Sequence, residues 1–133
     1  TNSGSAYNVS KTSTFYYSYN RGSDGANNLQ ADTNRDLAEG TGFQDIAFNS
    51  NVDNYSSLVG SLFIFNPSNT TFVKHFMSTT NDEAQTSGEQ GLTQICHVRG
   101  YMNTTSAVDA IRFQYTSGNM DSGKIKMYGI KDS

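Results

Sequence analysis

The sequence predicts an all-β protein, an antiparallel β-sandwich that is jelly-roll-like. Apolar and polar residues alternate with period two in most of the apolar segments, as in a strand with one buried face. Polar stretches rich in Gly, Asn and Ser separate these segments, and such residues favour turns over helices. Sequence order leaves open whether the sandwich is a jelly roll or has an immunoglobulin-like topology.

Seven segments are expected to be strands. They lie at residues 13–20, 42–49, 60–66, 71–78, 92–102, 110–116 and 124–130. The first, STFYYSYN, places Phe15, Tyr17 and Tyr19 on one face, and the second, GFQDIAFN, groups Ile46 with Phe48. Each of these groupings is typical of a strand that packs one face on a core.

The middle segments differ in how many of their faces are apolar. The third, GSLFIFN, is apolar on both faces, which is typical of a strand that is covered from both sides. The fourth, TFVKHFMS, and the fifth, LTQICHVRGYM, alternate. The fifth sets Cys96 and Val98 against His97 and Arg99. Cys96 is therefore expected in the core, on the face opposite His97.

The last two segments, AIRFQYT and KIKMYGI, are predicted to form a closing hairpin around the polar tip SGNMDSG. The first is expected to point Ile111, Phe113 and Tyr115 inward, and the second Ile125 and Met127. Elsewhere, NRDLAEG predicts a single helical turn that ends at a Gly. Asp24–Gly40 and Thr79–Gly91 are expected to be long loops that are free for contacts.

Charge and cysteine content exclude several classes of protein. The net charge is −3, whereas a surface that binds nucleic acid needs clustered Lys and Arg. One cysteine in 133 residues excludes an internal disulfide and a thiolate metal cage. No stretch approaches the roughly 18 apolar residues of a membrane span. We therefore expect a single domain, residues 1–133, with no nucleic-acid partner and no membrane insertion.

No catalytic residue, cofactor or metal is expected. His75 and His97 lack a third ligand at a useful spacing, although zinc needs three or four. The segment DTNRD begins like a calcium loop, but Leu37 and Phe43 stand where the turn glycine and the bidentate Glu should be. No triad, carboxylate pair or phosphate loop has suitable spacing, so the protein is not expected to be an enzyme.

Tyr16, Tyr17 and Arg21 are the candidates for surface recognition. Tyrosine provides a broad contact area at low entropic cost and can stack on a sugar ring. The alternative is that Tyr17, which shares a face with Tyr19, belongs to the core.

Three segments together resemble a β-sandwich domain of tailed-bacteriophage structural proteins, such as tail-fibre and virion decoration proteins. GSLFIFNPSNTTFVKHF (residues 60–76) resembles that family's strand, Asn-Pro turn and strand. TTSAVDAIRFQYTSGNMDSGKIKMYGI (residues 104–130) resembles its closing hairpin, with Met127 where the family usually has Leu. Residues 1–20 resemble its Gly-Ser-Tyr stretch more weakly.

The resemblance implies a virion component, such as a fibre, decoration or adhesin domain, with no catalytic residues. It implies a homo-oligomer, with a trimer favoured, that contacts other virion proteins and a host-surface glycan. Such domains usually have further strands before the position that matches Thr1. The chain is therefore expected either to be the C-terminal part of a longer protein or to complete its sheets with strands from a neighbouring subunit. Two alternatives are a carbohydrate-binding module and a subunit of a bacterial extracellular filament or surface layer.

Overall fold

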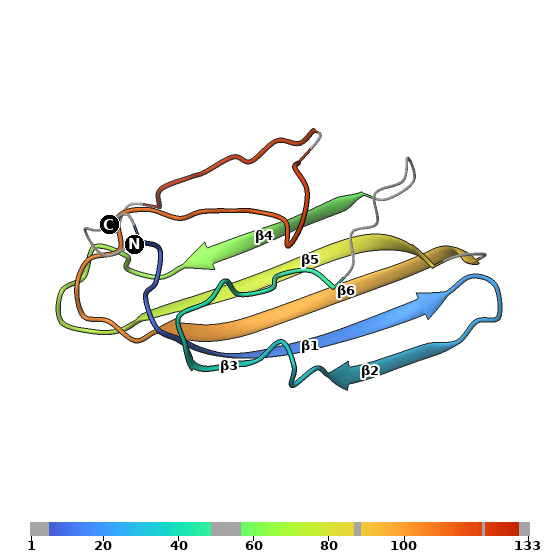
Figure 1. Cartoon of the computed structure of the whole chain (residues 1–133), viewed down its shortest axis with the longest axis horizontal. Helices are drawn as coiled ribbons and strands as arrows, with labels where there is room; N and C mark the ends of the chain where they lie inside the picture. Colours follow the sequence, from blue (N-terminus) through green and yellow to red (C-terminus); the bar gives the residue numbers. More distant parts are fainter. Residues whose placement is uncertain (1–5, 49–56, 87–88, 121, 131–133) are drawn as a thin grey trace.

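A computed structural model describes residues 6–48, 57–86, 89–120 and 122–130. Within these residues, six strands form one antiparallel sheet with the order β2-β1-β6-β5-β4, and β3 also pairs with β1 (Figure 1). The strands are β1 (Lys11–Arg21), β2 (Asn27–Ala31), β3 (Leu37–Gly40), β4 (Leu58–Ile64), β5 (Lys74–Thr86) and β6 (Glu89–Met102). The predicted all-β, antiparallel class is confirmed. A second sheet that would complete a sandwich stays a prediction.

Strand β6 lies at the centre of the sheet, between β1 and β5. It pairs with β5 as a long hairpin, in which Lys74 lies opposite Met102 and Ala84 opposite Leu92. It pairs with β1 along the whole length of β1, from Lys11 opposite Met102 to Arg21 opposite Leu92. The three longest strands therefore share one continuous register, and the shorter strands lie at the two edges.

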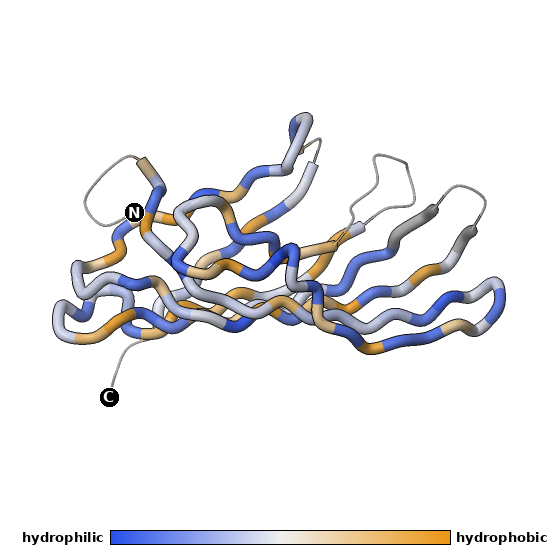
Figure 2. Tube along the Cα trace, turned by 60° about the horizontal axis from the view of Figure 1, so that its bottom comes forward, coloured by the Kyte–Doolittle hydropathy of each residue, from blue (hydrophilic) through white to orange (hydrophobic). Residues whose placement is uncertain are grey.

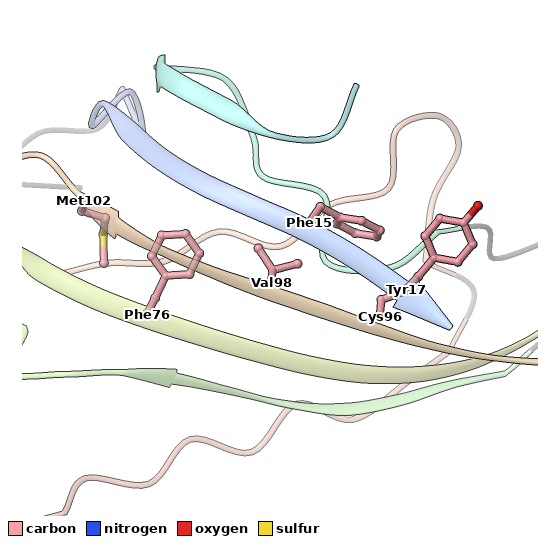
Figure 3. Close-up of a cluster of buried hydrophobic side chains, with 6 residues drawn as sticks. All are labelled: Phe15, Tyr17, Phe76, Cys96, Val98 and Met102. Atoms are coloured by element: carbon pink, nitrogen blue, oxygen red, sulfur yellow. The ribbon is translucent and has the colours of Figure 1, made fainter. Parts of the chain in front are cut away.

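One face of the sheet carries the hydrophobic core (Figure 3). The side chains that share this buried face come from β1, β5 and β6, because side chains of one parity point to the same side of a sheet. They are Phe15, Tyr17, Phe76, Cys96, Val98 and Met102. The predicted inward positions of Phe15, Tyr17, Cys96 and Val98 are confirmed by their burial.

Irregular chain, rather than a second sheet, covers this core in the described residues. The Phe48 ring lies 4.5 Å from the Tyr17 ring, centroid to centroid, and Val108 also packs against the cluster. The Thr80 hydroxyl donates to the Ile46 carbonyl at 2.6 Å. The segment at residues 41–48 is therefore held against the sheet by side-chain contacts instead of a strand ladder.

The strand expected at residues 42–49 is wrong over its described part, residues 42–48, and residue 49 lies outside the described residues. The cause is the polar chemistry of the segment. The Gln44 amide donates to the Arg35 carbonyl at 3.1 Å and to the Asp45 carbonyl at 2.9 Å. The Ser13 hydroxyl bonds to the Gln44 side chain as well. These bonds hold the segment in an irregular path over the core face of the sheet.

The helical turn expected in residues 34–40 is also wrong, because Leu37–Gly40 forms strand β3. The outer edge of β1 needs hydrogen-bond partners, and this segment supplies them. The Asp36 carboxylate accepts the Phe15 amide at 2.6 Å, and the Leu37 amide donates to the Ser13 hydroxyl at 3.1 Å. The loops expected at 24–40 and 79–91 are therefore shorter than predicted, since β2, β3 and parts of β5 and β6 occupy them.

A glycine permits the close packing at the centre of the sheet. Gly100 lies opposite Ser13 on one side and Phe76 on the other. A Cβ atom at this position would lie 2.4 Å from the Thr12 carbonyl oxygen and 2.9 Å from the tip of the Phe76 ring. The Phe76 ring thus occupies the space above Gly100 that a larger residue would fill.

The two closing strands expected at 110–116 and 124–130 do not form in the described chain. Residues 103–120 and 122–130 instead form an extended run that goes out and back, and none of them belongs to a strand (Figure 1). We call residues 110–130 the C-terminal arm. The root of the arm is fixed, because the Val108 amide donates to the Pro67 carbonyl at 2.8 Å. Lys74 Nζ also donates to the carbonyls of Thr104 and Thr105, at 3.3 and 2.9 Å.

Candidate interaction surface

The face of the sheet opposite the core consists of half-buried and exposed side chains in the described residues. The register places these side chains in rows across the strands, for example Tyr16, His97, Thr79 and Ser61. We call this the open face. Its larger side chains are Tyr16, Leu29, Val59, Phe63, His75, Met77, Ile95, His97, Arg99 and Tyr101. Hydrophobic and hydrophilic residues alternate along these strands (Figure 2).

The centre of the open face is rigid. The Tyr16 and His97 rings stack with their centroids 5.0 Å apart and their planes 18° apart. His97 Nδ1 lies 3.3 Å from the Thr79 hydroxyl. Arg99 Nη1 donates to the Ser78 carbonyl at 2.6 Å. These contacts link β1, β5 and β6 through their side chains as well as through the backbone ladder.

The protonation of His97 follows from this environment. Partial burial lowers the pKa of His97, and the neighbouring Arg99 guanidinium lowers it further. A His with a lowered pKa is neutral at pH 7. The open face therefore has its fixed positive charge at Arg99, and His97 contributes a neutral ring that can stack or accept a hydrogen bond.

A hollow of about 510 Å³ lies at one end of the open face. Side chains from β5 and β6 line it, namely His75, Met77, Arg99 and Tyr101, together with Phe65. Neither a carboxylate nor a thiol belongs to this lining. His75 and Tyr101 lie opposite each other in this lining, with their ring centroids 6.2 Å apart.

Strand β4 forms the edge of the sheet next to β5. Its sequence, LVGSLFI, has no charged residue and no proline. Val59 is 64% exposed and Phe63 is 49% exposed. Natural edge strands are usually protected by charges, prolines or bulges. An apolar edge without this protection marks a surface that another chain segment can cover.

No family model, no curated protein and no solved structure matches this chain.

The structure separates the three residues predicted for surface recognition. Tyr16 lies on the open face and is half-buried against His97. Tyr17 is 7% exposed and belongs to the core, which corrects its assignment to a recognition surface. The reason is strand parity, because Tyr17 shares the face of Phe15. Arg21 lies away from both, at the end of β1, where its guanidinium pairs with Asp24 at 3.3 Å.

The two histidines lie on the open face in different rows, His75 opposite Tyr101 and His97 opposite Thr79. In the described residues no group of three or more His, Cys, Asp or Glu side chains could hold a metal ion. The DTNRD segment uses its side chains internally, since Asp32 pairs with Arg35 at 3.1 Å. Across the described ranges, no helix has the length and apolarity to cross a bilayer.

The apolar edge at β4 was missed as a functional feature. Its signal was present, because the segment is apolar on both faces, but that pattern is also the pattern of a central strand. Here the strand has a neighbour on one side in the described structure, β5. The apolar pattern of β4 therefore indicates a surface that another chain segment can cover.

The Cys96 thiol is expected to be unreactive in the folded protein. The side chain is fully buried. Burial raises the pKa of the thiol to about 11, and the charge of Asp82 adds to this effect. At pH 8 a thiol reagent should label native Cys96 at least about a hundredfold more slowly than it labels the protein in urea, because reaction requires unfolding.

The same shift gives a pH dependence with a definite sign. The folded-state pKa of Cys96 lies above that of an unfolded thiol, about 8.5. The stability gained by burying the neutral thiol is therefore complete below the pKa of the unfolded thiol and is lost as the pH rises toward 11. Equally fast labelling in buffer and in urea would contradict the burial of Cys96. Urea titrations at pH 8 and pH 10 would measure the loss of stability.

Proposed function

We propose that this chain is a non-enzymatic structural or attachment component of a phage virion, and that it assembles with copies of itself through the open face and the β4 edge. The observation that carries this proposal is the amount of surface that one chain leaves exposed. Oligomeric packing would be the means by which the domain acts. Contacts with other virion proteins would use the surfaces that remain free.

The exposed surface is larger than a monomer of this mass needs. The accessible surface of the chain is 9148 Å² for a mass of 14.5 kDa. A compact monomer of that mass exposes about 6,900 Å². The excess, about 2,300 Å², is comparable with the area that one subunit contributes to a permanent interface.

Part of this exposed surface is apolar and belongs to the open face and to the arm. Leu29, Val59 and Ile95 are exposed on the open face, and Ile125 and Met127 are exposed on the arm. Large exposed apolar patches mark sites of protein association. This distribution supports assembly with a protein partner.

The virion context is supported by the resemblance to phage structural proteins described above. The residues that carry it, 60–76 and 104–130, correspond in the structure to most of β4, the turn into β5, and the arm with its root. These elements hold part of the exposed apolar surface, namely Phe63 on β4 and Ile125 and Met127 on the arm. The residues that carry the resemblance therefore overlap in part with the surface that would carry assembly.

The proposed function is tested by the oligomeric state of the purified domain and by its presence on phage particles. We expect one oligomer of fixed stoichiometry, with a trimer favoured, in light scattering coupled to size-exclusion chromatography. The measurement uses about 5–50 μM protein, roughly the concentrations at which specific interfaces form. We also expect antibodies against the domain to label phage particles in immuno-electron microscopy. A monomer throughout this range, or unlabelled particles, would overturn the proposal.

A further inference from the structure

We infer that the C-terminal arm of one copy adds to the free edge of β4 in a second copy, so that subunits are joined by exchanged strands. This inference rests on the proposed function, because it specifies how the copies assemble. It requires an acceptor edge, a donor segment that can form a strand, and a tether that allows exchange. Each of these is present in the single chain.

The acceptor is the edge of β4 that faces away from β5. The ladder between β4 and β5 is regular from Leu58 opposite Asp82 to Ile64 opposite Phe76. It is extended at one end by the bond from the Phe65 amide to the His75 carbonyl, at 3.0 Å. A regular, extended strand of this kind presents backbone groups on its far side that a further strand can pair with.

The donor is the return leg of the arm, residues 122–130. Ile125, Met127 and Ile130 are 62%, 88% and 88% exposed. Three apolar side chains of this size are seldom left so exposed within six residues unless they meet a partner. Nine extended residues span about 30 Å and the seven residues of β4 about 23 Å, so the leg is long enough to pair with the whole of β4.

The tether holds the arm root close to the acceptor edge. Val108 bonds to Pro67, in the turn that follows β4. Buried Lys74 binds the carbonyls of Thr104 and Thr105. The arm therefore leaves the sheet beside the end of β4 and extends out and back, and none of its described residues belongs to a strand (Figure 1).

A second copy is the occupant that this geometry favours. In the described part of the chain, the outer edge of β4 and the return leg of the arm each have no strand partner, so identical copies would satisfy both at once and could close into a symmetric ring. The excess surface of about 2,300 Å² per chain is of the size that such an exchange would bury. An unrelated partner would satisfy the acceptor and leave the donor exposed.

The first experiment places a charge at the acceptor edge. Val59→Lys should raise the dissociation constant of the oligomer at least tenfold in analytical ultracentrifugation, because a lysine on an edge strand opposes strand addition. Asn28→Lys is the control, since Asn28 is exposed on the opposite edge strand, β2, and lies opposite Tyr19, off the open face. Asn28→Lys should leave the dissociation constant unchanged. Circular dichroism of both variants verifies that the sheet is intact.

The second experiment detects the exchange directly. A chain with Ser61→Cys, on the exposed β4 strand, is mixed with a differently tagged chain that carries Met127→Cys or Lys126→Cys. The two arm positions point to opposite sides of a strand, so one of them shares the face of Ser61→Cys whichever way the donor strand faces. Cys96 is buried and does not interfere. We expect a mixed disulfide between the two tags under mild oxidation.

The outcomes distinguish this inference from the proposed function. A wild-type oligomer that Val59→Lys weakens, together with the mixed disulfide, supports arm exchange. A wild-type oligomer that resists Val59→Lys and gives no mixed disulfide overturns arm exchange and leaves the proposed assembly standing. A wild-type monomer overturns both.

Discussion

Replacing Phe15 with alanine is expected to lower the free energy of unfolding by about 3–5 kcal/mol. Phe15 is fully buried. Its ring lies within 6.4 Å of Tyr17 and 6.5 Å of Phe48, and the Arg35 guanidinium lies 5.7 Å from it, all measured to ring centroids. The substitution removes the contacts between Phe15 and residues 41–48, the segment that covers the core. This segment cannot collapse fully into the space. Urea denaturation followed by circular dichroism measures the change.

Phe72→Ala is the matched control, because it removes the same side chain at a position that is 70% exposed. Its effect should stay within about 0.5 kcal/mol. A Phe15→Ala protein as stable as Phe72→Ala would show that the core does not lie on this face of the sheet. A typical domain is stable by about 5–15 kcal/mol, so the expected loss is large enough to unfold part of the population.

Replacing Lys74 with methionine is expected to lower the free energy of unfolding by about 2–3 kcal/mol, because it removes the charge-assisted hydrogen bonds from Lys74 to three backbone carbonyls. Lys74 is fully buried. Besides the Thr104 and Thr105 carbonyls, its Nζ donates to the Phe72 carbonyl at 2.9 Å. Methionine fills a similar volume, so the loss isolates the hydrogen bonds. Guanidinium denaturation measures the global change.

A second measurement separates loosening of the arm from general destabilisation. Chymotrypsin should cleave Lys74→Met after Phe113 or Tyr115 faster than the wild type, under conditions where the sheet remains folded. Lys124→Met is the control, because Lys124 is exposed on the arm. If the cleavage rate of the arm is the same in all three proteins, Lys74 does not fix the arm root.

The sequence predicted the strands whose own side chains alternate. Strands β1, β5 and β6 carry the period-two pattern that one buried face requires, and Phe15, Cys96 and Val98 lie in the core as expected. Strands β2 and β3 could not be found in this way. Strand β2 reads NNLQA and is exposed throughout, so its partner, the edge of β1, determines its conformation more than its own side chains do.

The candidate surface was predictable in part. Tyr16 lies on an exposed face, whereas Tyr17 shows that adjacent aromatic residues in a strand cannot both face solvent on the same side. The two-sided apolar pattern at residues 60–66 correctly indicated a strand. It could not indicate whether the segment that covers this strand belongs to the same chain, because local hydropathy shows that a segment is apolar but not which chain buries it.

The central position of β6 sets the order in which the molecule can fold as it is synthesised. Residues 11–21 emerge from the ribosome before residues 92–102, with which they form their longest ladder. Until that later segment emerges, β1 can pair with β2 and β3, but Phe15 and Tyr17 lack Val98 and Cys96 to pack against. Pairing over such a separation is slow, and the nascent chain would gain from a chaperone that shields Phe15 and its neighbours through most of translation.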